Sequence, residues 1–358
     1  MTIAHLPASV FPDLIAAAGA HTVAALADQG WRPSDLIDDP GFRQGVGAGI
    51  VALLVVLAAA VLVSRPRRWR DAVLPVAGIA TVVATLVALD RTGPSVLSSR
   101  RLGVGLVLLL VGPFAAAIVL GRWRRSWPVA VATAVAAIPG GVVVARAASL
   151  QNHIGWVPAL VFASAVIGGA LVADFDDANA RAGLSPVLLA LAGLGMYVTV
   201  PDTEQTSVLV GVLLPLALLG WPVARARLGP GAYATVGLVA WAAAVGGRGR
   251  PGSVVGAIAS LGVLLAEPIA RRLWRGRARV PRRPTSGRAL LMVALQLGIV
   301  VITSRVAGLE TSGPAAAGIS LVALALAVGG AAIVLAPRGS EEPRGRSPER
   351  EGRRVPNS

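Results

Sequence analysis

Long apolar runs recur along almost the whole chain, and the short segments between them carry most of the charged side chains. A helix needs roughly 20 mostly apolar residues to cross about 30 Å of hydrocarbon. About eleven runs meet this requirement, at 46–64, 72–89, 102–121, 127–145, 155–173, 185–201, 206–223, 231–247, 253–270, 289–307 and 314–336. The pattern therefore predicts an all-α fold, a polytopic integral membrane helix bundle of about eleven transmembrane helices.

The chain divides into three parts at the limits of these runs. In residues 1–45, apolar positions at helical spacing are interrupted by Asp13, His21 and Asp28, which favours an interfacial amphipathic helix in an extracytoplasmic segment. Residues 46–337 are the predicted transmembrane bundle. Residues 338–358 are rich in Arg, Glu, Pro, Gly and Ser, so we expect a disordered cytoplasmic tail that cannot bury an apolar core.

The orientation follows from the Arg residues, because short cytoplasmic loops carry an excess of basic side chains. Arg clusters follow the first, third, seventh and ninth runs, and the densest extends from Arg271 to Arg288. All of them come after odd-numbered runs. The acidic segment that begins at Asp174 and the basic loop at 91–101 disagree, but the sum of the loops favours one orientation. We expect the N-terminus outside and the C-terminus inside, in a multi-pass protein of the cell (plasma) membrane.

Composition supports a membrane protein and narrows its chemistry. Hydrophobic residues make up 55% of the chain and charged residues 14%, whereas about a quarter of the residues in soluble domains are charged. The absence of Cys excludes disulfides and thiolate metal sites. The chain has no phosphate-binding P-loop and no His-Glu-x-x-His pattern, which argues against an ATP-driven motor and a zinc hydrolase. We expect no cofactor and no metal.

The net charge of +15 points to anionic partners other than nucleic acid. Nucleic-acid binding needs a basic face on a folded module, whereas these charges lie in short clusters between apolar runs. The bilayer is the first expected partner. The cluster from Arg271 to Arg288 would suit a cytoplasmic protein partner or anionic lipid headgroups.

Charges and prolines also recur along the chain at regular intervals. Charged residues return at the outer ends of the even-numbered runs, roughly one helical hairpin apart. An offset of 102 positions superposes Pro113 on Pro215, Pro128 on Pro230 and Arg146 on Arg248. This spacing predicts hairpin repeats or a duplicated four-helix unit, as in many transporters. The alternative is that any array of hairpins with charged loops looks periodic.

The outer ends of the even-numbered runs hold the candidate site residues. Arginines there could bind an anionic group such as a phosphate, because the guanidinium fork matches its geometry, with nearby carboxylates as counter-ions or a protonatable coupling site. The candidate substrate-binding residues are Arg146, Arg248, Arg305, Asp202, Glu204, Asp90, Arg91 and His153. The alternative for each is an ordinary solvated loop charge with a snorkelling side chain.

Three further features lie in or beside the predicted spans. Pro139, Gly140 and Gly141 predict a helix break, which in transporters lines a cavity and elsewhere is a packing kink. Glu267 and Gln296 are the most deeply placed polar residues, and we expect Glu267 to pair with Arg271 and Gln296 to join helices. The acidic residues Asp174, Asp176 and Asp177 predict a solvated cytoplasmic loop.

Three functions fit these observations. The first is a transporter or flippase-like carrier whose outer-facing cavity accepts an anionic substrate, lipid-linked ones included. The second is a membrane enzyme that acts on a lipid-linked substrate at the outer interface, with Asp202 or Glu204 and His153 as acid and base. The third is a non-catalytic membrane subunit that docks a partner through its Arg-rich cytoplasmic loop.

Overall fold

Every regular element that the computed structural model describes is a helix, which confirms the predicted all-α class. It describes residues 32–62, 82–84, 100–121, 127–179, 184–200, 204–220, 228–247, 250–274 and 286–308, and the isolated positions 17, 20, 24, 27, 87, 322 and 325. The helices are α2 (Pro33–Asp38), α3 (Pro40–Leu62), α5 (Arg100–Gly121), α6 (Trp127–Ser149), α7 (Val157–Ala163), the π-helical turn η2 (Ser164–Gly168), α8 (Gly169–Asn179), α9 (Leu184–Thr199), α10 (Glu204–Gly220), α11 (Gly231–Gly246), α12 (Pro251–Ala259), α13 (Gly262–Trp274) and α14 (Ser286–Gly308).

Three described helices are long and apolar enough to cross a membrane: α5, α6 and the continuous α7–η2–α8 helix. A fourth is added if the bent pair α12–α13 counts as one span, and α3, α9, α10, α11 and α14 contain shorter apolar helices. Each predicted run except 72–89 and 314–336 coincides with a described helix or with this bent pair. Those two runs, the amphipathic N-terminal helix and the tail lie almost wholly outside the described residues. The count of eleven spans and the orientation stay predictions.

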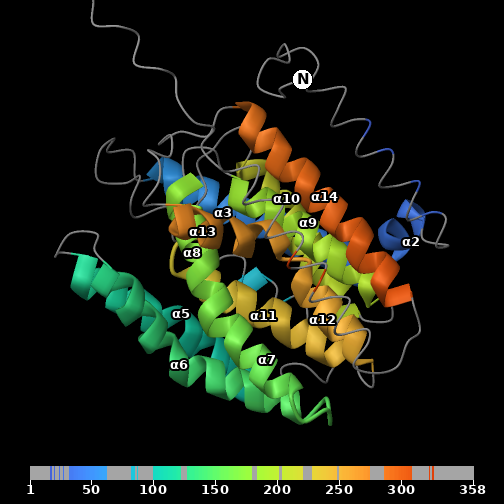
Figure 1. Ribbon diagram of the computed structural model, residues 1–358. Coiled ribbons are helices and arrows are strands. Elements are labelled where there is room, and N and C mark those ends of the chain that lie inside the picture. The colour runs from blue at the N-terminus through green and yellow to red at the C-terminus, as the bar shows by residue number, and fades with distance from the viewer. Residues whose placement is uncertain are drawn as a thin grey trace, which may run out of the picture.

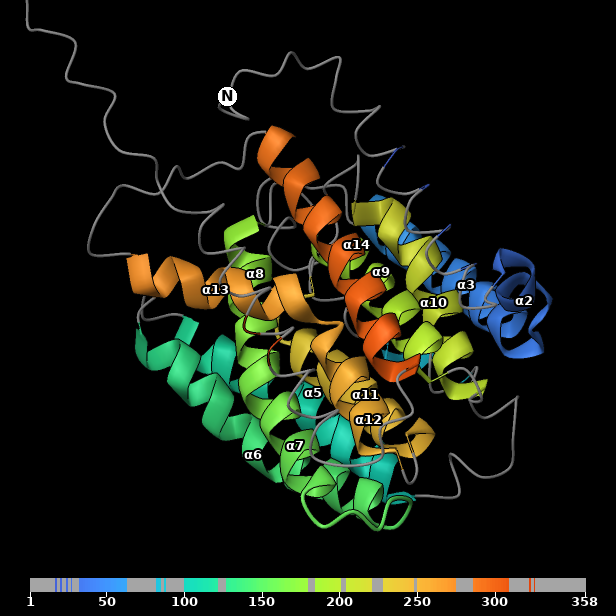
Figure 2. The ribbon, with the colours of Figure 1, turned by 45° about the vertical axis from the view of Figure 1, so that its right-hand side comes forward.

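The helices pack in layers around α11 (Figure 1, Figure 2). The hairpin α5–α6 lies on one side, and α3, α9, α10 and α14 lie on the other. Between them, α11 contacts α8 and α12, and α13 contacts α8. Because α11 is buried along its whole length from Gly231 to Val245, it forms the centre of the bundle.

The helix α3 begins at Pro40, earlier than the predicted span, because Asp39 caps it. The Asp39 Oδ1 oxygen accepts hydrogen bonds from the backbone N–H groups of Gly41, at 2.7 Å, and Phe42, at 3.2 Å. A proline at the first helical position leaves no N–H unsatisfied there. The same oxygen accepts a hydrogen bond from the Ser207 hydroxyl of α10 at 3.0 Å, so one carboxylate both starts α3 and joins it to α10.

In the hairpin α5–α6, the structure corrects the predicted helix break at Pro139, Gly140 and Gly141. Helix α6 runs through Pro139 without interruption. A Cβ on Gly140 would lie 2.6 Å from the backbone nitrogen of Leu109 on α5, and one on Gly141 would meet side chains of α7 and η2. The two glycines therefore permit close approach of α6 to neighbours on two sides, a common use of small residues between membrane helices. Packing on both sides keeps the helix continuous.

The structure also corrects the prediction for the acidic segment from Asp174 to Asp177, which is helical and not a solvated loop. Helix α8 continues to Asn179, and Asp176 is only 2% exposed. Its carboxylate is buried because it binds backbone groups of a segment far along the chain, which spacing within the acidic segment cannot reveal.

Two helices of the bundle interior have irregular backbones. The long helix α7–η2–α8 contains the π-helical turn that starts at Ser164, and the pair α12–α13 is bent by 62° beside Ser260. An Ala-Ser pair stands at both irregularities, Ala163 with Ser164 and Ala259 with Ser260. Such irregular turns inside otherwise regular helices are frequent at functional sites.

Helices that the 102-residue offset superposes wholly or in part lie side by side in three cases. Helix α6 contacts α11, α8 contacts α13, and α9 contacts α14. The irregular helices α7–η2–α8 and α12–α13 are therefore neighbours as well as similar. The start of α6 and of α11 also shares the pattern Pro-x-Ala-x-Ala-Thr, from Pro128 to Thr133 and from Pro230 to Thr235. This agreement is what a duplicated unit would produce.

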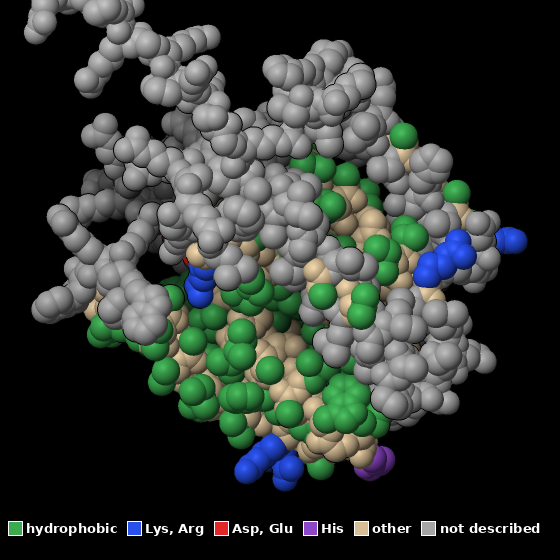
Figure 3. Space-filling model, in the orientation of Figure 1, with side chains coloured by type: hydrophobic (Ala, Val, Ile, Leu, Met, Phe, Trp, Pro, Cys, Tyr) green, Lys and Arg blue, Asp and Glu red, His purple; other side chains and the backbone are tan. Residues whose placement is uncertain are grey.

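Apolar side chains cover the surface of the hairpin α5–α6 and of α7 (Figure 3). On α5 they include Val104, Val107 and Val111, which are more than half exposed. Soluble monomers rarely expose continuous apolar patches of this kind, whereas lipid-facing helices do.

Candidate functional site

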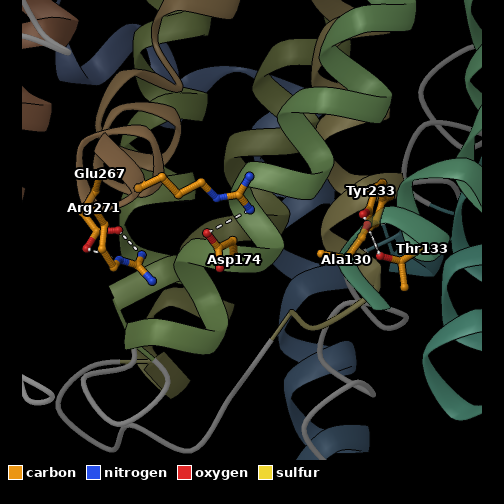
Figure 4. Close-up of polar contacts among 7 residues, drawn as sticks. Ala130, Thr133, Asp174, Tyr233, Glu267 and Arg271 are labelled. Atoms are coloured by element: carbon orange, nitrogen blue, oxygen red, sulfur yellow. Dashed lines mark hydrogen bonds and ion pairs between the residues drawn. The ribbon is translucent and has the colours of Figure 1, made fainter. Parts of the chain in front are cut away.

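Two ion pairs lie where α8 and α13 end (Figure 4). We call this the inner end, because the sequence predicts it to be cytoplasmic. Glu267 and Arg271 form a doubly hydrogen-bonded pair within α13, and the Arg271 Nε donates to Glu267 Oε1 at 3.2 Å. Their side chains are only 3% and 12% exposed. The expected pairing of Glu267 with Arg271 is thus confirmed.

The second pair joins two helices. Arg272 Nη2 of α13 lies 3.3 Å from Asp174 Oδ2 of α8, with the side chains 47% and 25% exposed. This Oδ2 atom is buried but has no hydrogen-bond partner among the described residues, so the contact is electrostatic and lacks hydrogen-bond geometry. A half-exposed pair of this type is much weaker than the buried Glu267–Arg271 pair.

A third acidic side chain at this end binds backbone N–H groups. The Asp176 Oδ2 atom accepts hydrogen bonds from the N–H groups of Leu228, at 3.1 Å, and Gly229, at 3.0 Å. Gly229 has φ 50°, in the left-handed region that glycine adopts without a steric penalty. The carboxylate therefore holds the turn that leads into α11 against α8.

Gln296 of α14 seals the bend between α12 and α13. Its side-chain NH₂ donates to the Ser260 carbonyl, and its Oε1 accepts a hydrogen bond from the Val263 N–H at 3.2 Å. The Ser260 hydroxyl donates to the Ala192 carbonyl of α9 at 2.8 Å. Because Gln296 and Ser260 are fully buried, these bonds satisfy backbone groups that the bend removes from the helical pattern. The expected role of Gln296 in joining helices is confirmed.

A hydroxyl pair joins the related helices α6 and α11 in the same part of the bundle (Figure 4). The Thr133 and Tyr233 hydroxyl oxygens are 3.1 Å apart and share a hydrogen bond. Gly169 of α8 lies against Tyr233, since a Cβ there would be 2.8 Å from the Tyr233 Cα atom. Polar links thus connect α6 to α11 and α8 to α13.

The structure describes only some of the residues predicted at the outer ends. Arg146, Arg305 and His153 are exposed. Arg248, Asp202, Asp90 and Arg91 lie outside the described residues, as does the side chain of Glu204, whose backbone begins α10. Helices α11 and α12 stand between α6, which carries Arg146, and α14, which carries Arg305. Convergence of these side chains on one cavity stays a prediction.

A buried amide nevertheless organises the outer end near His153. Asn152 donates from Nδ2 to the Ala244 carbonyl of α11 at 2.9 Å, and its Oδ1 accepts from the Ile154 N–H at 3.0 Å. Asn152 is 3% exposed, whereas the adjacent His153 is an exposed residue. The loop after α6 is thereby fixed to the central helix.

The described part of the chain contains no group of three or more His, Asp or Glu side chains that could hold a metal ion. Two residues of these contacts that the sequence did not single out individually are Ser260 and Arg272. Ser260 lies in an apolar run with no proline at the bend, and Arg272 is one of many arginines in a cluster.

Comparison of the chain with known protein families, with curated proteins and with solved structures finds no match.

Proposed function

We propose that the chain is a multi-pass protein of the cell membrane that carries an anionic substrate across the bilayer. The observation that carries this proposal is the 62° bend of α12–α13, whose backbone groups are satisfied by Gln296 in the bundle interior. Discontinuous helices at membrane depth form the substrate and ion sites of many transporters. The buried Glu267 and Arg271 lie on the second half of this bent helix, beside the proposed path.

The carrier would have about eleven spans, an outer N-terminus and an inner C-terminus. The directions of the described helices support this order. Helices α5 and α6 pack antiparallel, since Gly105 lies against Val144 and Gly112 against Ala136. Helices α3 and α10 pack parallel, since Gly45 lies against Val208 and Gly49 against Val212. Both relations are required when consecutive spans alternate in direction.

Two repeats, α5 to α9 and α10 to α14, would form the core of the carrier. Their support is the side-by-side packing of α6 with α11, α8 with α13 and α9 with α14. In transporters built from repeats, the substrate site lies at the interface between the repeats. Here that interface contains both irregular helices.

An anionic substrate is supported by the charges. At the inner end, Glu267 and Asp174 each pair with an arginine, and at the outer end Arg146 and Arg305 are exposed. Guanidinium groups suit phosphate and carboxylate ligands, so the exposed Arg146 and Arg305 would attract such groups at the outer end. The outer residues Arg248, Asp202, Glu204, Asp90, Arg91 and His153 would complete the outer entrance.

The proposal is tested with the purified full-length protein in phosphatidylcholine liposomes. One arm measures uptake of radiolabelled inorganic phosphate, and the other measures transbilayer movement of fluorescent phosphatidylglycerol by quenching with dithionite. We expect protein-dependent movement of one probe, which identifies a soluble or a lipid-linked substrate. Gln296→Leu should reduce it, whereas Gln44→Leu, on the exposed surface of α3, should not. Absence of movement of both probes with folded protein contradicts the proposal.

A further inference from the structure

The Asp174–Arg272 ion pair connects the inner ends of the two irregular helices. It differs from the neighbouring Glu267–Arg271 pair, in which both residues belong to α13. In the connecting pair Arg272 is 47% exposed and Asp174 is 25% exposed, and the buried Asp174 Oδ2 atom makes no hydrogen bond among the described residues. A partly exposed ion pair without hydrogen-bond geometry contributes little stability, and water can solvate both groups once α13 moves away from α8. The polar link between α8 and α13 is therefore one that opens easily.

The other end of α13 is firmly held. At the bend, Ser260 is hydrogen-bonded to α9 through Ala192, and Gln296 binds the Ser260 carbonyl and the Val263 N–H from α14. These groups are buried, whereas Arg272 is exposed. Helix α13 is thus anchored at the bend and held at its far end by a partly exposed ion pair.

The seam between the two helices is apolar above the ion pair. A Cβ on Gly168 would lie 3.6 Å from the Leu265 side chain, which places Leu265 of α13 against the last residue of η2, where α8 begins. Movement of α13 away from α8 would expose this apolar seam at the inner end.

We propose that the Asp174–Arg272 pair is a latch that closes the inner end of the bundle. When the latch is closed, α13 rests on α8 and covers the apolar seam at Leu265. When it opens, α13 pivots about the bend beside Ser260, and the seam between the proposed repeats becomes accessible from the inner side. This inference rests on the proposed function, for which the latch is the inner gate.

The test uses thiol reactivity, because the chain contains no Cys and an introduced Cys is the single thiol. Leu265→Cys reports on the seam, and Ala192→Cys, a fully buried position on α9, serves as the control. Each is combined with Asp174→Asn, with Arg272→Gln, and with the exchange Asp174→Arg together with Arg272→Asp. The full-length protein in liposomes is labelled with a charged maleimide on both sides of the membrane.

We expect Leu265→Cys to react about fivefold faster after either neutralisation, the change in population that follows loss of a half-exposed ion pair. The charge exchange should restore the slow rate, and Ala192→Cys should stay unreactive throughout. An unchanged rate after neutralisation, or a charge exchange as fast as the single variants, would overturn the latch. Faster labelling of Ala192→Cys would show general loosening and would also overturn it.

The readout does not depend on transport. If neutralisation speeds labelling as expected but neither transport probe moves, the proposed function is rejected and the latch is supported. Transport without any change in labelling would reject the latch and keep the proposed function.

Discussion

Gln296 and Ser260 are joined by a hydrogen bond from the side-chain amide of Gln296 to the backbone carbonyl of Ser260, at the point where α12 ends and the chain turns toward α13. They are 36 positions apart in the sequence and both are fully buried. The amide oxygen of Gln296 also accepts the Val263 N–H, so one side chain replaces the two helical hydrogen bonds interrupted by the bend.

Replacement of Gln296 should therefore destabilise the bundle. Gln296→Leu leaves the Ser260 carbonyl and the Val263 N–H buried without this partner, and we expect a loss of about 2–4 kcal/mol in the free energy of unfolding, from roughly 1–3 kcal/mol per group. Denaturant unfolding in detergent, followed by tryptophan fluorescence, measures it. Gln44→Leu, at an exposed position of α3, is the matched control and should change stability little. Equal stability of both variants would refute the assigned role.

The buried ion pair of α13 should show a characteristic pattern of mutations. Glu267→Ala leaves Arg271 buried without its carboxylate, and we expect a loss of about 3–5 kcal/mol, as for other broken buried pairs. The double replacement Glu267→Leu with Arg271→Met removes both charges and should be less destabilising than either single change. The same unfolding measurement decides this, and a double variant worse than the sum of its single variants would contradict the pairing.

Close packing of α5 against α6 should depend on Gly140. Gly140→Leu would force the hairpin apart, because even a Cβ would lie 2.6 Å from the Leu109 nitrogen. We expect a loss of about 1–3 kcal/mol in the free energy of unfolding. Gly103→Leu is the control on the same hairpin, since a Cβ there has nothing within 4 Å. Thermal unfolding should separate the two variants clearly.

The carboxylate of Asp176 should matter more than that of its neighbour Asp177. Asp176→Ala removes the acceptor of the Leu228 and Gly229 N–H groups, and we expect a loss of about 1–3 kcal/mol. Asp177→Ala, at an exposed position on the same helix, should have a smaller effect. A similar loss in both variants would mean that net charge at the end of α8 matters and the turn before α11 does not.

The orientation can be tested with single thiols in the Cys-free chain. His153→Cys and Asp177→Cys lie at opposite ends of the α7–η2–α8 helix, and both positions are exposed. With the N-terminus outside, a membrane-impermeant maleimide should label His153→Cys in intact cells and Asp177→Cys only after permeabilisation. The reverse pattern would invert the orientation, and labelling of both in intact cells would contradict a spanning helix.

Local patterns predicted some of these contacts. The four-residue spacing of Glu267 and Arg271 was enough to predict their ion pair, because partners one helical turn apart meet on any helix. The predicted helix break at Pro139 was wrong because the pattern shows that one hydrogen bond is lost but not that α5 and α7 pack on both sides of a continuous helix. The acidic segment at Asp174 was misread for a related reason, since the groups that bind Asp176 lie 52 and 53 positions away.

The sequence by itself determined that the fold is helical and where most helices run, because apolar runs of this length can satisfy their backbone only as helices in an apolar medium. Only the tertiary structure decided where a helix bends, which acids are buried and which arginine each acid meets. Those outcomes depend on the approach of side chains from distant segments, such as Gln296 to Ser260 and Arg272 to Asp174, and neither the period nor the composition of a run encodes that approach.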